Sequence, residues 1–368
     1  MLTIPNGMAR VPDFDEARSL RGQAERLRSV VRAAAGLRER FAAGASVVAL
    51  RTLPLTTLPY PTKYALQGAA GSLSPFVRFT HRATLVQFLQ GGALKTLLFN
   101  PTDIEAARAT PYFADIARRF GALEPLLQKR FPTLEAQLAS LGLGVADIDY
   151  VAFDHFHTQD LRGQLGTDDG LHHARFPNAT LLAPKREWDD WQDVHPMQRA
   201  WFIKDGRRGV RTDRVALTDA DLLLGEGVML VRTPGHTVGN QTLFLNTDSG
   251  VWGISENGTC ADNWSPRDSA IRGVASTARA QDLDVLLNAN TPERGGDQYT
   301  SMMLEKTLVS RVKAAPTFVQ MFPSSEITAG VLMPLRPTWV HRTIAMGTVS
   351  KPTATRAEPG AEVSAAGG

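Results

Sequence analysis

The sequence feature that most constrains this chain is a pair of histidines at the end of a short apolar run. Asp149–Phe153 reads as a buried strand, and His155 and His157 follow it directly. Because strand side chains alternate with a period of two, both rings are expected on the same side of the chain. A third histidine, His236, follows a second strand-like run, Gly227–Arg232. The pattern therefore places three imidazoles at turns where strands end and predicts a metal site.

The histidines favour a catalytic metal site over a structural one. Three imidazole nitrogens can hold one ion at about 2.0–2.1 Å and leave coordination positions open for a reactant. The chain has a single cysteine, Cys260, so it can form neither a Cys₄ zinc site nor an internal disulfide. The alternative is three unrelated surface or core histidines, which is the usual role of a lone histidine. The shared strand-end position favours the metal site.

Composition narrows the class of protein. With 368 residues and 43% apolar content, the chain can bury a large core, either in one α/β domain with additions or in two domains. Its 40 Lys and Arg nearly balance 37 Asp and Glu without a long basic block, which argues against a nucleic-acid partner. No run reaches the ~20 apolar residues of a membrane helix, and Met1–Val11 lacks the apolar core of a signal peptide. We expect a cytoplasmic, bacterial protein without a membrane partner.

Alternating strand and helix patterns predict two sheets packed together with helices outside. Phe14–Ala43 reads as one long amphipathic helix. We expect a helical extension over 1–45, a catalytic domain over 46–315 and C-terminal strands over 316–351 that pack on it. Residues 352–368, rich in Ala, Gly, Pro and Glu, are expected to be disordered. The long helix could cover the chain's own sheet or form a homodimer.

At these histidines the chain resembles the metallo-β-lactamase-fold superfamily of metallohydrolases. In that superfamily one strand ends in His-x-His-x-Asp-His and a later strand in Pro-Gly-His, which His155, His157 and His236 match. The resemblance covers about residues 46–300 and implies an α/β fold, the αββα sandwich, with these histidines binding a first metal ion. Leu97–Asn100 is similar to the buried strand that precedes the usual Asp of the superfamily, with Asn100 in its place. Three further segments are most similar to the acyl-homoserine lactonase branch: Phe176–Ala179, Glu187–Trp188 and Thr233–Gln241.

The second metal site departs from the family pattern. Gln159 and Asp160 stand where the resemblance implies an Asp and a fourth His. Glu256 aligns with the bridging Asp, and Asn290 aligns with the histidine that follows the last strand, here expected at Leu283–Asn288. Oxygen atoms alone favour harder ions such as Mn²⁺, Mg²⁺ or Ca²⁺ over zinc. The second ion is therefore expected to differ in kind, to bind weakly or to be absent.

The changed ligand set leaves the roles of the nearby carboxylates open. If the second ion is absent, Asp160 is expected to act as general base on a metal-bound water, or it could itself be a ligand. Glu256 could still bind the first ion, for which Zn²⁺, Fe²⁺ and Mn²⁺ all suit three nitrogen ligands. Thr259 falls where the lactonase branch has its catalytic Tyr, so that role is vacant.

Five further residues carry weaker expectations. Asp154 precedes the histidine pair and could support a ligand histidine or cap a turn. Arg162 could hold the predicted general base or a substrate carboxylate. His341 could return on a C-terminal strand and replace the missing late histidine. His81 has no ligand-like context and is expected to be structural. Trp201 could pack a helix on the sheet or form the wall of a pocket.

We expect a hydrolase that uses a metal-activated water, with its pKa lowered toward ~7, on a small lactone, ester or related acyl compound. One or two zinc ions are expected as cofactor, with iron or manganese as alternatives. A mononuclear iron-dependent oxygenase or redox enzyme on the same fold is a second hypothesis, because three histidines leave positions open for O₂. A non-catalytic binding protein is the third.

Overall fold

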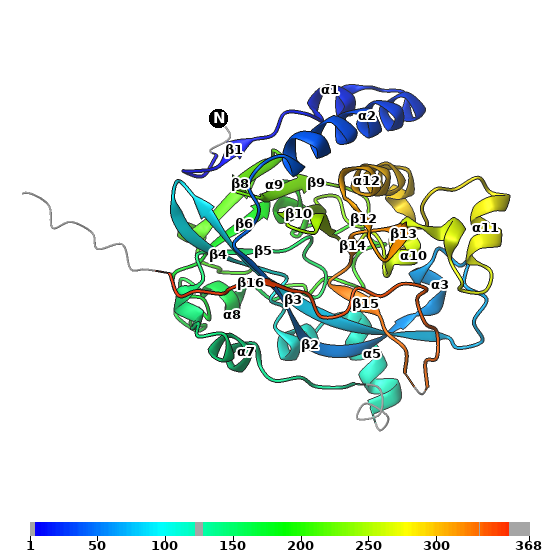
Figure 1. The fold of residues 1–368 in the computed structure, drawn as a ribbon. Helices are drawn as coiled ribbons and strands as arrows, with labels where there is room; N and C mark the ends of the chain where they lie inside the picture. Colours follow the sequence, from blue (N-terminus) through cyan, green and yellow to red (C-terminus); the bar gives the residue numbers. More distant parts are fainter. Residues whose placement is uncertain (1–3, 122–127, 331, 353–368) are drawn as a thin grey trace, which may run out of the picture.

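The structure is a computed structural model of the chain, and it describes residues 4–121, 128–330 and 332–352. Two β-sheets lie face to face, and helices cover the outer face of each (Figure 1). The αββα sandwich predicted from the sequence is therefore confirmed. Apart from Pro352, the tail predicted to be disordered lies outside the described residues. No helix in the described ranges combines the length and apolar character needed to cross a bilayer.

The first sheet has the strand order β16-β2-β3-β4-β5-β6-β7, with β15 also pairing with β3. The pairs from β2 to β4 are antiparallel, whereas β4, β5, β6 and β7 run parallel. Parallel strands end at the same edge, so the loop after β5 opens there. The strand bounds are β2 (Ala49–Pro61), β3 (Phe76–Gln90), β4 (Ala93–Phe99), β5 (Tyr150–Ala152), β6 (Thr180–Pro184), β7 (Val215–Thr218), β15 (Ser325–Ile327) and β16 (Ala345–Gly347).

The second sheet has the order β1-β8-β9-β10-β11-β14. Strand β9 shows the expected alternation: Val228 and Leu230 enter the layer between the sheets, and Met229 and Val231 face the helices. Beside it lies a two-stranded sheet of β12 and β13. The bounds are β1 (Ala9–Arg10), β8 (Leu222–Gly225), β9 (Val228–Arg232), β10 (Gln241–Thr247), β11 (Gly250–Ile254), β12 (Arg311–Val312), β13 (Ala315–Val319) and β14 (Met321–Phe322).

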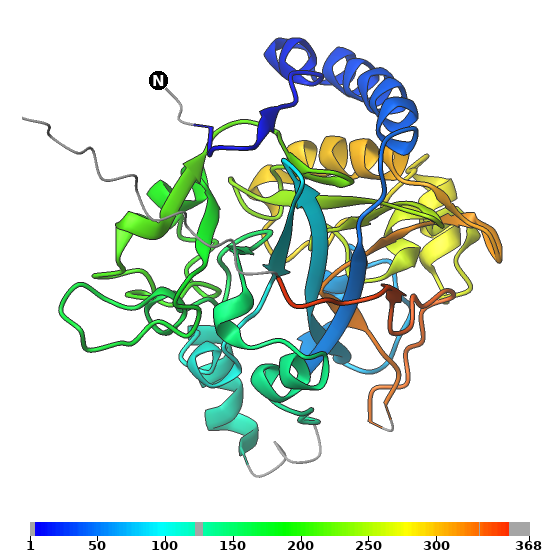
Figure 2. The ribbon, with the colours of Figure 1, turned by 60° about the vertical axis from the view of Figure 1, so that its left-hand side comes forward.

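Two long helices, α2 (Gln23–Ala42) and α12 (Gly295–Leu308), lie together on the outer face of the second sheet (Figure 2). Helix α2 buries Val30, Ala34 and Leu37 against that sheet. The N-terminal helix was predicted either to cover the chain's own sheet or to form a homodimer. In the structure it covers the chain's own sheet.

The remaining helices are short. They are α1 (Asp15–Ser19), α3 (Thr62–Ala65), α4 (Ile104–Ala107), α5 (Pro111–Phe120), α7 (Leu134–Ser140), α8 (Arg162–Leu165), α9 (Lys185–Asp190), α10 (Ala261–Trp264) and α11 (Val274–Ala280), with 3₁₀ turns at Val145–Asp147, Thr212–Arg214, Pro266–Asp268 and Pro292–Arg294. Helices α7, α8 and α9 contribute side chains to the apolar cluster on the outer face of the first sheet, and α4 and α5 line the cavity described below.

Two sequence-based element predictions are wrong. The single helix over Phe14–Ala43 is broken, because Leu20 is extended (ψ 132°) and Gly22, a poor helix former, precedes α2. The break lets α1 fold against α2. Leu283–Asn288 forms no strand, because its backbone amides donate to helix residues, a turn and side chains instead of a neighbouring strand. Within it, Leu286 N–H donates to the Asn263 carbonyl at 2.8 Å.

Candidate metal centre

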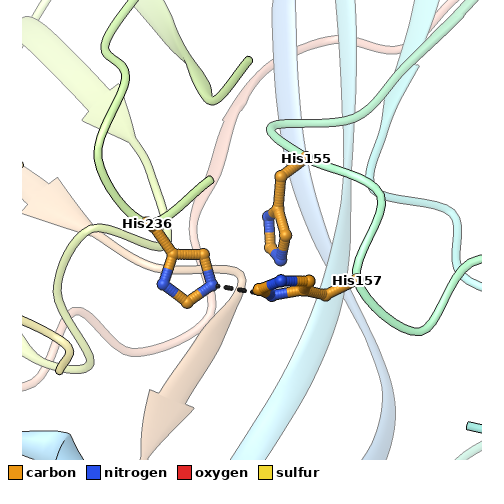
Figure 3. A group of neighbouring side chains, drawn as sticks. All are labelled: His155, His157 and His236. Carbon is orange, nitrogen blue, oxygen red and sulfur yellow. Dashed lines mark hydrogen bonds between the residues drawn. The ribbon is translucent and has the colours of Figure 1, made fainter. Parts of the chain in front are cut away.

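Three histidine rings meet at the edge of the sandwich where β5 and β9 end, with their nitrogens turned toward one another (Figure 3). One nitrogen of each ring lies within 4.8 Å of the others. Nδ1 of His157 and Nε2 of His236 are 3.2 Å apart, and all three residues are less than one-tenth exposed. The structure therefore brings together His155, His157 and His236, as the sequence pattern predicted.

The backbone of each histidine-bearing loop is held in place by a contact with another part of the chain. Thr158, directly after the histidine pair, has a positive φ of 62°, which is unusual for a β-branched residue. Its amide donates to the Trp201 carbonyl at 2.8 Å, which holds this turn. In the other loop, a Cβ on Gly235 would lie 2.2 Å from Cα of Gln298, so only glycine fits. Both ring-bearing turns are therefore fixed by contacts far away in the sequence.

His155 is oriented by the preceding aspartate. Asp154 is almost fully buried, and its Oδ1 accepts hydrogen bonds from the Nδ1 (2.7 Å) and backbone N–H (2.9 Å) of His155. Its Oδ2 accepts from Nδ2 of Asn100 at 2.8 Å. Asn100 directly follows β4 and has a φ of 54°, a conformation that Asn tolerates better than most residues. Because Nδ1 is engaged, Nε2 of His155 is the atom left for a ligand.

The charge environment suits a cation. Burial, reinforced by the charge of His155, lowers the pKa of both His157 and His236 well below the ordinary value. These rings are therefore neutral near pH 7, and a neutral imidazole keeps a lone pair for an ion. Burial also opposes protonation of His155, but the carboxylates of Asp154 and Glu256 raise its pKa overall.

Oxygen atoms border the histidines on the same cavity. Glu256 accepts a hydrogen bond from the Ser325 amide at 2.6 Å, and burial together with Asp154 raises its pKa to about 8. Oε1 of Gln159 and Oδ1 of Asn290 are buried without a hydrogen-bond partner in the described structure. Unpaired buried oxygens are rare, and a nearby cation would both satisfy them and favour ionised Glu256. The residues present therefore fit a bound metal ion.

Asp160, predicted as general base or ligand, is turned away from this cavity. Its Oδ1 accepts from Nε of Arg162 at 2.9 Å and its Oδ2 from Nη2 at 2.5 Å. It lines no part of the cavity that the histidines share. The prediction for Asp160 is wrong because an arginine two residues later captures both carboxylate oxygens. This local pairing is one of the two roles proposed for Arg162.

His341 also lies away from the histidine cluster. Its ring packs against Trp252, with centroids 5.0 Å apart, and its Nε2 lies 3.2 Å from the Val319 carbonyl oxygen. The strand that follows it, β16, pairs with the first residues of β2 at an edge of the first sheet. The C-terminal segment therefore does not return His341 to the site, and the prediction that it replaces the late histidine is wrong.

The cavity beside the histidines has a volume of about 170 Å³ and a largely apolar wall. That wall is lined by Leu58, Phe79, Ile104, Phe113, Ile116 and Trp201. Of the two roles considered for Trp201, the structure thus shows the pocket wall. An apolar wall above a few convergent polar groups is typical of a small-molecule site.

Sequence reasoning missed several polar residues of this cavity. His81 lines it, with its ring nitrogens each 2.9 Å from the Ser325 and Thr102 hydroxyls, and burial lowers its pKa to about 4. Tyr60 also lines it and donates to Oδ1 of Asn288 at 2.5 Å. Thr259, by contrast, is buried and donates to the Ala65 carbonyl. Tyr60 and Asn288 are 228 positions apart, so no local motif could have joined them.

Comparisons with known proteins agree with the motifs. No protein-family profile matches the chain. The N-acyl homoserine lactonase AttM of Azorhizobium caulinodans is 31% identical over 120 residues, which is 30% of this chain and 40% of the relative. The chain thus matches about two-fifths of the length of that curated relative.

Solved structures of hydrolases also align with the chain, at low identity. A probable metal-dependent hydrolase from Staphylococcus aureus aligns with a TM-score of 0.47 and 14% identity, over 71% of this chain and 83% of that chain. AidC, a dizinc quorum-quenching lactonase, aligns with a TM-score of 0.44 and 14% identity, over 71% and 82%. The curated lactonase, matched over part of its length, agrees with the resemblance that the histidine motifs indicated.

Proposed function

We propose that the protein is a metal-dependent hydrolase that cleaves a small lactone, ester or related acyl compound. The observation that carries this proposal is the cluster of three buried histidine nitrogens within 4.8 Å of one another at a largely apolar cavity. A divalent ion held there would lower the pKa of a water toward ~7 and polarise an acyl carbonyl. Zinc is the ion we expect, with iron and manganese as alternatives for three nitrogen ligands.

The surrounding residues have distinct proposed roles. His155, His157 and His236 hold the ion, and Asp154 fixes the tautomer of the first ring. Glu256 faces the same cavity, where it can bind the ion or accept a proton from the attacking water. The oxygens of Gln159 and Asn290, which line the same cavity, would complete a weaker, oxygen-only second site with Glu256.

The wall of the cavity supports the proposed substrate class. Apolar side chains from β2, β3, α4 and α5 surround the space in front of the histidines. Such a wall favours an acyl group with an apolar chain over a charged or sugar-like substrate. The curated relative is an N-acyl homoserine lactonase, so acylated lactones head the compounds to be tested.

Metal analysis with a substrate panel tests the proposal. Protein from minimal medium should carry about one tightly held zinc, iron or manganese ion per chain, and chelation should abolish hydrolysis of an active lactone or ester. Restoring the ion should restore the rate. Stoichiometric iron with oxygen uptake would instead support the oxygenase hypothesis. A metal-free protein that hydrolyses nothing in the panel would support the binding-protein hypothesis.

A matched pair of carboxylate variants tests the role of Glu256. Glu256→Gln should lower kcat/KM by about 10²-fold, the usual scale of a lost general base. Asp160→Asn should stay within about threefold of wild type, because the Asp160 carboxylate is paired with Arg162 and does not line the cavity. Steady-state kinetics on one substrate compares the two. A larger loss for Asp160→Asn than for Glu256→Gln would reverse the assignment.

A further inference from the structure

One glutamine side chain contacts both histidine loops of the candidate metal centre. Gln198 is 6% exposed and lies on the segment between α9 and β7. Its Oε1 is hydrogen-bonded to Nε2 of His157. Its Nε2 donates to the backbone carbonyl of His236 at 3.2 Å. The same amide therefore links the ring that follows β5 to the loop that follows β9.

A carboxylate fixes which way this amide points. Nε2 of Gln198 also donates to Oε1 of Glu293 at 2.5 Å. A carboxylate only accepts, and so does the His236 carbonyl, so both partners require the NH₂ end of the amide. Reversing the amide would place its oxygen against two acceptors. Oε1 is thus directed to His157.

The direction of the amide decides the tautomer of His157. An amide oxygen can only accept, so Nε2 of His157 must carry the proton and Nδ1 must carry the lone pair. Nδ1 is the atom that lies 3.2 Å from Nε2 of His236, on the side where the histidine nitrogens converge. The other tautomer would present an N–H to the ion and could not bind it.

We propose that Gln198 is a positioning residue of the metal centre, which holds His157 as the Nε2–H tautomer and keeps the His157 and His236 loops in register. The inference rests on the proposed metal site. Gln198 itself does not face the ion. It acts through the ring it contacts, and Glu293 acts in turn by orienting its amide.

Substitution at position 198 tests this role with two readouts that do not depend on turnover. Gln198→Met keeps the length of the side chain and removes the acceptor. It should weaken binding of Zn²⁺ or Co²⁺, measured by chelator competition, by about 10- to 100-fold, the usual effect of losing such a supporting partner. In the metal-free protein, ¹⁵N NMR of labelled histidine should show His157 as Nε2–H in the wild type and as a tautomer mixture in Gln198→Met.

A charge-conserving double variant separates positioning from general damage. In Gln198→Glu with Glu293→Gln, the new carboxylate accepts from His157 while the new amide at 293 donates to it. The double variant should recover the Nε2–H tautomer and only part of the lost affinity, because a carboxylate at position 198 cannot donate to the His236 carbonyl. Gln87→Met is the matched control, because Gln87 is also buried but donates to Thr96 and Ser350, away from the histidines. Its metal affinity should equal that of the wild type.

The outcomes distinguish this inference from the proposed function. If Gln198→Met binds the metal within about twofold of wild type and keeps the Nε2–H tautomer, the positioning role is overturned. Equal loss in Gln198→Met and Gln87→Met would overturn it as well, because the effect would then reflect general packing. If the wild type binds no ion while NMR shows the predicted tautomers, the proposed function fails and the role of Gln198 in setting the ring survives.

Discussion

Replacing His157 with alanine is expected to lower kcat/KM by at least about 10³-fold and to leave the protein without its ion. The ring supplies one of three nitrogens that lie within 4.8 Å of one another. Two imidazoles bind a divalent ion far more weakly than three, and catalytic zinc sites use three protein ligands. The loss should exceed that for Gln198→Met, because Gln198 contacts the ring and not the ion. Kinetics and metal analysis of the dialysed protein measure both effects.

An exposed histidine provides the control for this experiment. His172 lies on the loop between α8 and β6, and its backbone amide donates to Thr167. His172→Ala should retain both the ion and the rate. His157→Ala protein that kept its metal content and its activity would show that the reactive centre lies elsewhere, even though the fold remained as described.

The second large effect is expected at a buried ion pair beside the site. Arg82 on β3 is 7% exposed and Glu326 on β15 is fully buried, with Nη1 and Oε2 2.7 Å apart. Arg82→Met should destabilise the fold by about 3–5 kcal/mol, because it leaves a buried charge without its partner. Denaturant unfolding measures the loss. The same strand holds Ser325, whose amide contacts Glu256, so the defect should also disturb the cavity.

Removing both charges should restore much of the stability. The double variant Arg82→Met with Glu326→Leu replaces the pair by apolar groups of similar size and should lie within about 1–2 kcal/mol of wild type. If the double variant is as unstable as Arg82→Met alone, the ion pair is not the cause of the loss. This comparison therefore separates the unpaired charge from the change in packing.

The loss of folding stability caused by Arg82→Met should also depend on pH. Burial raises the pKa of Glu326, and Arg82 opposes that rise. A carboxyl whose pKa is higher when folded binds more protons in the folded state, so its contribution to stability falls as pH rises past about 4.3, the ordinary value for Glu. Without Arg82 the pKa rises further. The variant should therefore lose more stability, relative to wild type, at about pH 8 than at about pH 5.

The candidate site was predictable where its chemistry lies in local motifs. The His155 and His157 pair follows from the two-residue period of a strand, and His236 from the next strand end of the same kind. Gln198 was missed because its partners lie 38 to 95 positions away. Asp160 was misassigned because family alignment gives a position but not the direction of a side chain, and Arg162 decided that direction.

The fold was predictable at the level of layers and less so at the level of elements. The apolar run within Gly227–Arg232 indicated a strand, and the residues of β9 lie in both cores. Leu283–Asn288 is also rich in apolar residues, yet its backbone amides donate to groups outside the sheets, such as the carbonyls of Asn257 and Asn263. The pattern of apolar residues predicts which side chains are buried, but it does not predict which backbone groups form hydrogen bonds with one another. That choice depends on residues such as Asn257 and Asn263, which are distant in the sequence.

The position of the histidines has a mechanical consequence. His157 and His236 are 79 residues apart, and they follow strands that belong to different sheets. An ion bound by both histidines would act as a non-covalent cross-link between these two points of the chain. Because the ion binds the folded protein, it would favour the native state by mass action. The proposed catalytic centre would then also hold the two sheets together, and removing the ion would lower the stability of the fold as well as the activity.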